Sequence, residues 1–161
     1  MIRAAGPGDI PAILGIWNPV IRDSAITFNP VEKTHADLSA MLAERAAAGH
    51  ALLVAEEGGA VLGFATYGQF RGGAGYARTM EHTVHLGPQA RGRGIGRALM
   101  GAIEDHARAG GAGSMFAGVS GENAGGRAFH AAMGYAEVAV LPRVGWKFDR
   151  WFDLVLMQKF L

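Results

Sequence analysis

The sequence predicts an α/β protein with a mixed, mostly antiparallel central sheet that carries helices on both faces. Three observations predict this class. Several segments repeat apolar residues at helical spacing, and short apolar runs of strand length lie between them. Clusters among the 25 glycines mark the junctions and show no fixed period. Half of the 161 residues are apolar, which suffices for a sizeable core, so we expect residues 1–161 to form one domain.

The first third of the chain predicts one strand and two helices. A short strand is expected at Ile2–Ala4. Asp9 is suited to cap a helix from Ile10 to about Ile21, because the apolar residues of that segment fall on one face. The segment from Thr34 to Asp37 has the pattern of a capping box and opens a second helix, which ends near Gly49.

The middle of the chain predicts three strands. Residues 51–55 form a buried strand, 57–59 a turn and 61–67 the return strand, so the pair is a hairpin. Residues 70–78 are rich in glycine and irregular. Residues 79–86 form the next strand, which the following Gly-Pro pair ends.

The last third predicts two further helices and three strands. Helices are expected at 95–109 and 124–133, and strands at 115–119, 135–141 and 151–157. The complete order is strand, two helices, three strands, helix, strand, helix and two strands. That order is typical of a mixed sheet between two layers of helices.

Composition limits the classes of function. A net charge of +1 does not favour a general nucleic-acid surface. The chain has no cysteine, so thiolate catalysis, disulfides and cysteine-ligated metals are excluded. The first residues lack the apolar stretch of a signal peptide, and no apolar run approaches the roughly 20 residues that span a bilayer. We therefore expect a cytoplasmic protein without a nucleic-acid or membrane partner.

The segment from Gly87 to Arg97 joins a predicted strand to a predicted helix. Its glycines allow a tight turn and close approach to a ligand, and the helix start leaves amides unpaired. Three arginines, Arg91, Arg93 and Arg97, lie within seven residues. The segment therefore predicts a cradle for an anion such as a pyrophosphate, although a plain glycine-rich corner is the simpler alternative.

Three ligand classes use such turns. A nucleoside-triphosphate loop requires Gly-Lys-Ser/Thr, but Gly96 is followed by Arg97 and Ala98. A dinucleotide fingerprint fits poorly, because Gly92, Gly94 and Gly96 are spaced two apart in the middle of the chain. The pattern Q/R-x-x-G-x-G/A for coenzyme A is satisfied by residues 91–96.

With this turn, the sequence resembles the GCN5-related N-acetyltransferase (GNAT) superfamily over nearly its whole length. A second motif runs from Asn123 to His130 and closes with Met133-Gly134-Tyr135. Within the superfamily the chain is most similar to phosphinothricin and methionine sulfoximine/sulfone acetyltransferases. That likeness is carried by residues 81–86, by His130 and by the tail 141–153. The resemblance implies the acyl-CoA N-acyltransferase fold.

The resemblance implies acetyl-CoA as cofactor. Val84, His85 and Leu86 would pair by backbone with the pantetheine arm like an added strand. The pyrophosphate would lie on Arg91, Gly92, Arg93, Gly94, Ile95, Gly96 and Arg97, and Asn123 would hydrogen-bond the cofactor. Two positions depart from the pattern: Gly126 replaces a frequent serine, and His85 a frequent tyrosine.

The resemblance also implies where the acceptor binds. Ala74, Gly75 and Tyr76 would line the pocket of the amine substrate. Arg71, in the same loop, has the planar fork that suits a substrate carboxylate. The subgroup further implies a homodimer.

Direct acetyl transfer requires a base for the amine. Glu81 is the candidate general base, with a surface or salt-bridged glutamate as the alternative. His130 is the candidate for protonating the departing thiolate or for a base role, with a satisfied core histidine as the alternative. A backbone amide of Val84–Leu86 would stabilise the oxyanion. The five other histidines show no metal-ligand spacing and are interpreted as structural or solvated, so we expect no metal.

Two kinds of function remain open. The leading hypothesis is N-acetylation of the α-amine of a small amino-acid analogue, of the phosphinothricin, methionine sulfoximine or methionine sulfone type. Polyamines, aminoglycosides or protein N-termini are alternative acceptors. A non-catalytic acyl-CoA-binding module would keep the glycine turn but could lose Glu81 and His130. Both residues are present, which favours an enzyme.

The aromatic residues Trp146, Phe148, Trp151 and Phe152 are expected in a pocket wall, in the core or at a dimer contact.

Overall fold

The computed structural model describes all of residues 1–161. Its principal elements follow in chain order: β1 Ile2–Ala4, α1 Ile10–Asp23, α2 His35–Ala48, β2 Leu52–Glu57, β3 Ala60–Gln69, β4 Thr79–Leu86, α3 Ile95–Ala109, β5 Ser114–Ser120, α4 Ala124–Ala132, β6 Ala136–Lys147 and β7 Arg150–Phe160. Three short 3₁₀ turns precede α1, β4 and the glycine turn. The predicted order of elements and the fold class are confirmed.

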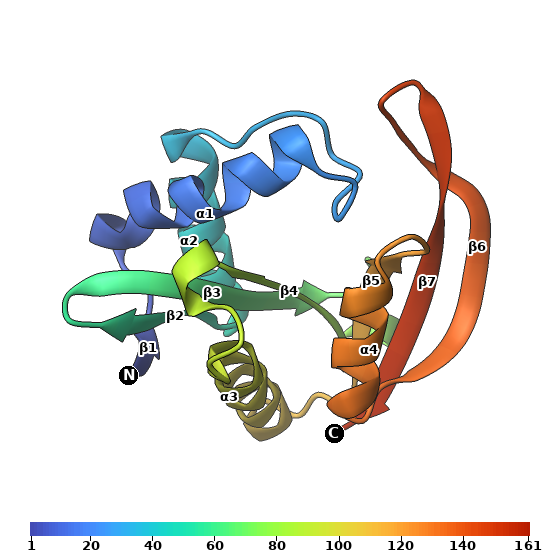
Figure 1. Cartoon of the computed structure of the whole chain (residues 1–161). Coiled ribbons are helices and arrows are strands. Elements are labelled where there is room, and N and C mark those ends of the chain that lie inside the picture. The colour runs from blue at the N-terminus through green and yellow to red at the C-terminus, as the bar shows by residue number, and fades with distance from the viewer.

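The strands form one sheet in the order β1-β2-β3-β4-β5-β7-β6. Every neighbouring pair is antiparallel except β4 with β5. Helices α1 and α2 lie over one face, and α3 and α4 lie against the other (Figure 1). Each face has its own apolar cluster: α1 and α2 pack on Leu52, Val54 and Phe64, and α3 packs on residues of β2, β3 and β4. The sheet is therefore the middle layer of three, as predicted.

The sheet opens between β4 and β5. The two strands pair only from Thr79 to Glu81, opposite Ser114 to Phe116. Beyond Glu81, β4 continues beside β3 while β5 continues beside β7. The outer edge of residues 82–86 therefore has no neighbouring strand, and a gap opens at this point of the sheet.

The helix starts differ in how they are capped. Thr34 Oγ1 accepts a bond from the Asp37 N–H at 3.2 Å, and the Asp37 carboxylate accepts from the Thr34 N–H at 2.8 Å, so the predicted capping box is confirmed. Asp9 is the N-cap residue of α1, as predicted, but its side chain makes no capping bond to that helix. Its carboxylate accepts from Arg3 and from the Gly6 N–H instead, because a 3₁₀ turn precedes the helix.

The last two strands are longer than predicted. Strand β6 extends through the segment 142–147, with an irregularity in its register between Leu141 and Gly145, and it meets β7 at a tight hairpin. The turn residues are Phe148 and Asp149, with φ of 52° and 56°. A turn with positive φ normally signals itself by glycine or asparagine, so this hairpin was missed.

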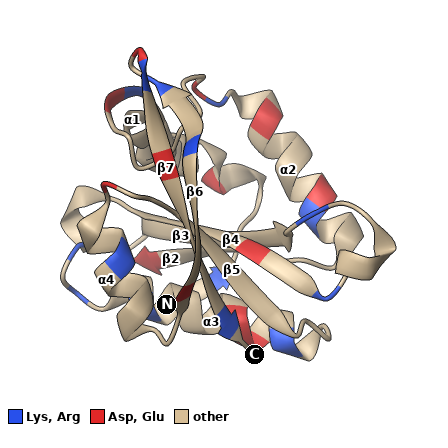
Figure 2. Cartoon of the chain, turned by 90° about the vertical axis from the view of Figure 1, so that its right-hand side faces the viewer, with Lys and Arg blue, Asp and Glu red and all other residues tan.

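The surface shows no single dominant charge. Figure 2, a ribbon viewed from the side of β6 and β7, shows acidic and basic residues scattered along the chain without a large group of one sign. None of the helices combines the length and apolar character needed to cross a membrane.

Candidate active site

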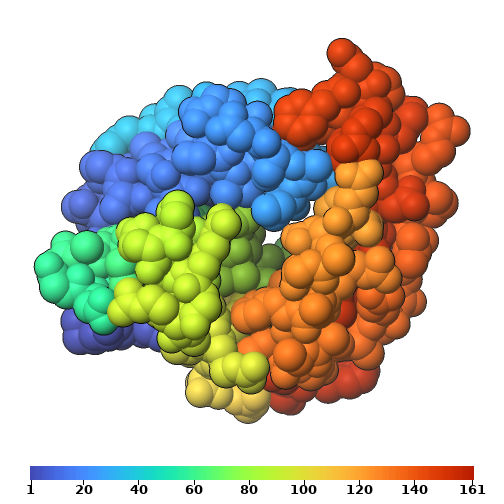
Figure 3. All heavy atoms as spheres, in the orientation of Figure 1, coloured from blue at the N-terminus to red at the C-terminus, as the bar shows by residue number.

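A cavity of about 690 Å³ lies at the opening between β4 and β5. Its walls come from α1 and the loop after it, from β4, from the glycine turn, and from β5 and α4. Figure 3 shows the hollow between the blue segment after α1, the green strands and the orange α4 region. The cavity thus passes through the sheet at the point where its backbone edge is free.

Nine of the predicted site residues line this cavity: Glu81, Val84, His85, Leu86, Arg91, Gly92, Gly96, Asn123 and His130. Four others of the glycine turn, namely Arg93, Gly94, Ile95 and Arg97, are not among the lining residues. The Arg93 guanidinium donates instead to both carboxylate oxygens of Glu57, at 3.0 and 2.8 Å. Arg93 is therefore engaged on the β2–β3 hairpin.

The predicted substrate residues Arg71, Ala74, Gly75 and Tyr76 do not line the cavity. All four are exposed, and the Arg71 guanidinium lies 5.6 Å from the centre of the Tyr76 ring. The loop joins β3 to β4 at the end of β4 where Glu81 lies. Its four predicted residues are nevertheless not part of the cavity wall to which Glu81 belongs.

The glycine turn has the geometry of an anion cradle. Gly92 and Gly94 have φ of 73° and 77°, a conformation that favours glycine. Gly94 is the N-cap of α3, and no side chain bonds the first amides of that helix. These amides and the positive end of the helix dipole suit a pyrophosphate.

Glu81 is a half-buried carboxylate without a partner. It is the last residue of β4 that pairs with β5, so its side chain lies where the two strands part. No hydrogen bond or ion pair within the protein holds the carboxylate. Burial raises the pKa of Glu81 above its usual value. A raised pKa without a compensating cation is typical of a general base.

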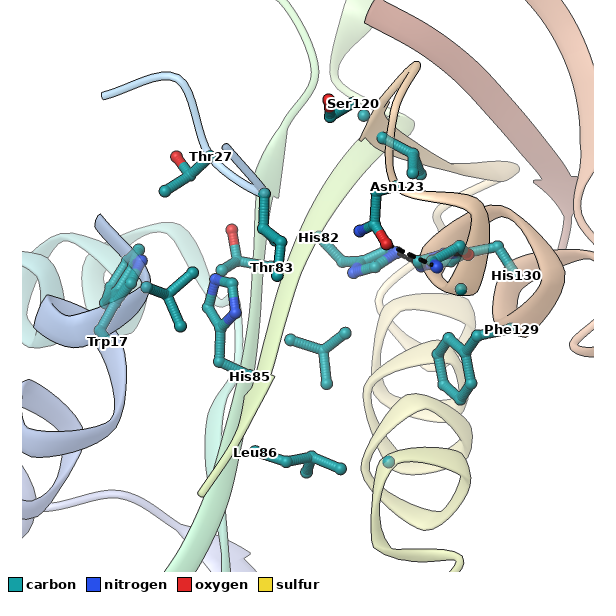
Figure 4. A pocket seen from close by; sticks show the side chains of 18 of the residues that line it. Trp17, Thr27, His82, Thr83, His85, Leu86, Ser120, Asn123, Phe129 and His130 are labelled. Carbon is teal, nitrogen blue, oxygen red and sulfur yellow. Dashed lines mark hydrogen bonds between the residues drawn. The ribbon is translucent and has the colours of Figure 1, made fainter. Parts of the chain in front are cut away.

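The rings of His82 and His130 face each other from β4 and α4 (Figure 4). Their Nε2 atoms lie 3.1 Å apart, and His130 Nδ1 lies 2.7 Å from the Gly126 carbonyl oxygen. The carbonyl can only accept, so His130 Nδ1 carries a hydrogen. The neutral His130 ring must then accept at Nε2 from His82 Nε2–H.

With the hydrogens arranged in this way, His82 Nδ1 carries no hydrogen and can only accept a hydrogen bond. It is the one buried side-chain polar atom of the protein without a hydrogen-bond partner. Burial lowers the pKa of His82 to about 3, and burial also lowers the pKa of His130. Both rings are therefore neutral at neutral pH. The earlier interpretation of His82 as merely structural or solvated is incomplete, because this side chain lines the cavity.

Asn123 and His85 have partners within the protein. Asn123 Oδ1 accepts from the Gly126 N–H at 2.9 Å and so caps α4. A Cβ at residue 126 would approach Asn123 Nδ2 to 2.4 Å, so the glycine allows the amide to fold back over the helix start. The His85 ring packs beside Trp17 and Phe64, and burial lowers its pKa to about 4.

Sequence reasoning missed the wall opposite α4. Ile26, Thr27 and Phe28 of the loop after α1 line the cavity, together with Trp17 and Val20 of α1. These residues belong to an ordinary amphipathic helix and a loop without a motif. Their one signal is the concentration of large apolar side chains in a connecting segment, where polar residues are usual.

The comparisons with known proteins agree with this geometry. The model of the "Acetyltransferase (GNAT) family" matches residues 18–135. The chain is 37% identical over 158 residues to the L-methionine sulfoximine/L-methionine sulfone acetyltransferase of Pseudomonas aeruginosa, covering 98% of this chain and 92% of that protein. It is 36% identical over 157 residues to the L-amino acid N-acyltransferase of Escherichia coli, covering 98% and 91%.

Solved structures show the same fold. The ribosomal-protein-alanine N-acetyltransferase of Brucella melitensis has a TM-score of 0.96 at 37% identity, covering 100% of this chain and 99% of that one. An acetyltransferase of Salmonella typhimurium, solved with its cofactor acetyl-CoA, has a TM-score of 0.95 at 36% identity, covering 100% and 93%. The chain belongs to the acetyltransferase (GNAT) family.

Within that family, the chain is an acetyl-CoA-dependent N-acyltransferase. The predicted family, activity class and cofactor are thereby confirmed.

Proposed function

We propose that this protein acetylates the amine of small amino-acid-like molecules, with Glu81 as general base. The observation that carries the proposal is the half-buried, unpartnered Glu81 carboxylate at the opening between β4 and β5. The names of the relatives from Pseudomonas aeruginosa and Escherichia coli support an amino-acid-like acceptor.

The residues present fit acetyl-CoA. The α3 amides and Gly92 suit the pyrophosphate, and the free edge of residues 82–86 suits the amides of an extended arm. When bound, acetyl-CoA supplies the activated acetyl thioester. Arg91, Gly96 and Asn123 also line this side of the cavity, so we assign it to the cofactor. Arg97 adds positive charge near the turn without lining the cavity, whereas the charge of Arg93 is paired with Glu57.

The chain's own residues account for proton movement and charge. Glu81 takes the proton of the attacking amine as the new C–N bond forms. A backbone amide at the free edge of β4, from Val84 or Leu86, would stabilise the negative charge on the acetyl oxygen, whereas the His85 amide faces β3. Glu81 would then return its proton to the departing sulfur, directly or through water, as the C–S bond breaks.

His130 is proposed to position the site. A role in protonating the thiolate would require its ring to release Gly126 or His82, because both ring nitrogens are engaged. We therefore propose that the His82–His130 pair holds α4 against β4, beside the cofactor arm.

The acceptor half of the cavity is apolar with a few hydroxyls. Ile26, Phe28 and Leu154 contribute apolar surface, and Thr27 and Ser120 contribute hydroxyls. No lysine or arginine lines this half. We retain Arg71 and the segment Ala74–Tyr76 as proposed partners of the acceptor, since a carboxylate needs a cation. That role requires the loop to move to the cavity or to reach the cavity of a second copy.

We also propose that the protein is a cytoplasmic homodimer built on one catalytic domain. Exposed apolar side chains on the edge hairpin β6–β7 support the dimer, among them Val138, Val140, Val144, Trp146 and Trp151. Sedimentation of the purified protein tests the oligomeric state.

Release of free thiol from acetyl-CoA tests the activity. The panel contains methionine sulfoximine, methionine sulfone, phosphinothricin, spermidine, an aminoglycoside and a peptide with N-terminal alanine. We expect turnover of the amino-acid analogues only. Turnover of the peptide alone would favour the second candidate, N-terminal acetylation, which the similarity to the Brucella melitensis structure suggests. Silence across the panel would contradict the proposal.

A further inference from the structure

The Lys147 side chain is buried near the end of β6, and its surroundings are unusual for a cation. It is 3% exposed, and no carboxylate faces it. Its ammonium instead donates to the carbonyl oxygens of Ile21 at 2.5 Å, Ser24 at 2.6 Å and Thr27 at 2.8 Å. An ammonium has three N–H donors, so each donor has one partner.

These carbonyls belong to the end of α1 and the loop after it. The last carbonyls of a helix lack intrahelical partners and form the negative end of its dipole. A single ammonium therefore satisfies buried carbonyls from residues more than 100 positions away in the sequence. It fixes the loop immediately beside Ile26, Thr27 and Phe28, which line the acceptor half of the cavity.

A second contact joins the same loop to the same hairpin. The Phe28 ring lies over Gly145, where a Cβ would approach the ring to 2.4 Å. On β7, Phe152 stacks with Phe28 at 5.4 Å between ring centres and an angle of 27°. Gly145 and Phe152 are paired across the hairpin, so both contacts come from one register position.

We propose that Lys147 and Gly145 form a clamp that positions the loop Ile26–Phe28 and thereby determines which amines the enzyme accepts. The inference rests on the proposed function. Lys147 touches no reacting atom, so it is a positioning residue. Its three acceptors converge on one nitrogen, a geometry that an ammonium matches and a planar guanidinium does not.

Steady-state kinetics on three variants test the clamp. Lys147→Met removes the bonds, Lys147→Arg keeps the charge, and Gly145→Ala displaces Phe28 while leaving Lys147 intact. Gly101→Ala, in α3 where an added Cβ meets no atom within 4 Å, is the matched control. We expect all three variants to raise KM for the amine about tenfold or more and to change the ratio of kcat/KM between small and bulky acceptors. KM for acetyl-CoA should stay within about twofold, and the control should match the wild type.

Hydrogen exchange of the purified protein supplies a readout that needs no substrate. We expect faster exchange in the segment 24–28 of the three variants, with no change in α3. Faster exchange with an unchanged amine KM and unchanged selectivity would overturn the proposal and leave a purely structural lysine. Unchanged exchange would overturn the clamp itself. If Lys147→Met does not fold, Gly145→Ala decides the matter alone.

The two proposals fail in different ways. Failure of the wild type on every amine of the panel overturns the proposed function, and the exchange data then decide whether the clamp holds the loop. An active wild type with unaltered selectivity in all variants overturns only the specificity role.

Discussion

The Glu81 carboxylate lies against the backbone of Gly118, with Oε2 3.1 Å from the position that a Cβ would occupy there. The two residues stand on β4 and β5 where these strands separate. Leu154 lies 3.5 Å from the same position. Gly118 therefore makes room for the proposed base in an otherwise filled corner, although the sequence offers no motif at this glycine.

We expect Gly118→Ala to lower kcat about tenfold, because the carboxylate must shift by a few tenths of an ångström from its reacting position. Acetyl-CoA affinity, measured by calorimetry, should not change. Gly15→Ala is the control, since a Cβ at that position in α1 meets no atom within 4 Å. Equal kcat in the two variants would contradict the contact.

Replacing the base itself should have a larger effect. We expect Glu81→Gln to lower kcat by about 10²- to 10⁴-fold with little change in acetyl-CoA binding, because the amide cannot take the amine proton. Stopped-time thiol release and calorimetry measure the two quantities. Glu44→Gln, at an exposed position of α2, serves as control.

The pH dependence of the enzyme's activity tests whether Glu81 is the general base. A base acts when deprotonated, so activity should be lost as the pH falls through the raised pKa of Glu81, at a midpoint above the ordinary value of 4.5. The residual rate of Glu81→Gln should lack this acid limb. A wild-type midpoint at or below 4.5, or the same limb in the variant, would assign the titration to another group.

The buried histidines predict instability in acid. Burial lowers the pKa of His82 to about 3 and that of His85 to about 4, from 6.5. The unfolded chain gains protons below about pH 6.5 while the folded protein does not, so stability is present above that pH and is lost as the pH falls. Each group contributes a slope of up to about 1.4 kcal/mol per pH unit.

Thermal unfolding between pH 7 and pH 5 measures this slope. His85→Gln should make the dependence on pH shallower, whatever its effect on the midpoint at pH 7. His35→Gln, at an exposed site at the start of α2, should keep the wild-type slope. If stability depended on pH with the same slope in the wild type and both variants, His85 would not be a source of the acid instability.

The glycine turn predicts a conformational effect. We expect Gly94→Val to weaken acetyl-CoA binding about tenfold or more, because φ of 77° strains a β-branched residue at the start of α3. A Cβ there meets no atom within 4 Å, so steric intrusion on a neighbour is not the cause. Gly101→Ala, in open space within α3, should bind acetyl-CoA as the wild type does. Calorimetry compares the two variants.

The sequence predicted what local patterns determine. Helical spacing and capping at Thr34 located the helices, and the turn around Gly92 located the proposed cofactor site. It did not predict the facing of His82 and His130, which are 48 positions apart, or the bonds from Lys147 to the loop after α1. Such contacts arise only when the sheet brings distant segments together. The turn at Phe148 and Asp149 was missed because its residues carry no local signal for positive φ.

The short β4–β5 ladder links the stability of the folded protein to the concentration of the molecule that binds beside it. Three residue pairs join these strands, and the remaining edge of β4 is free. A molecule that lies along this edge closes the sheet and binds the folded chain but not the unfolded one. Occupancy then raises the unfolding free energy by mass action, by about 2.7 kcal/mol at a hundred times the dissociation constant. A high concentration of acetyl-CoA would therefore protect the folded protein from proteolysis, and a low concentration would shorten its lifetime.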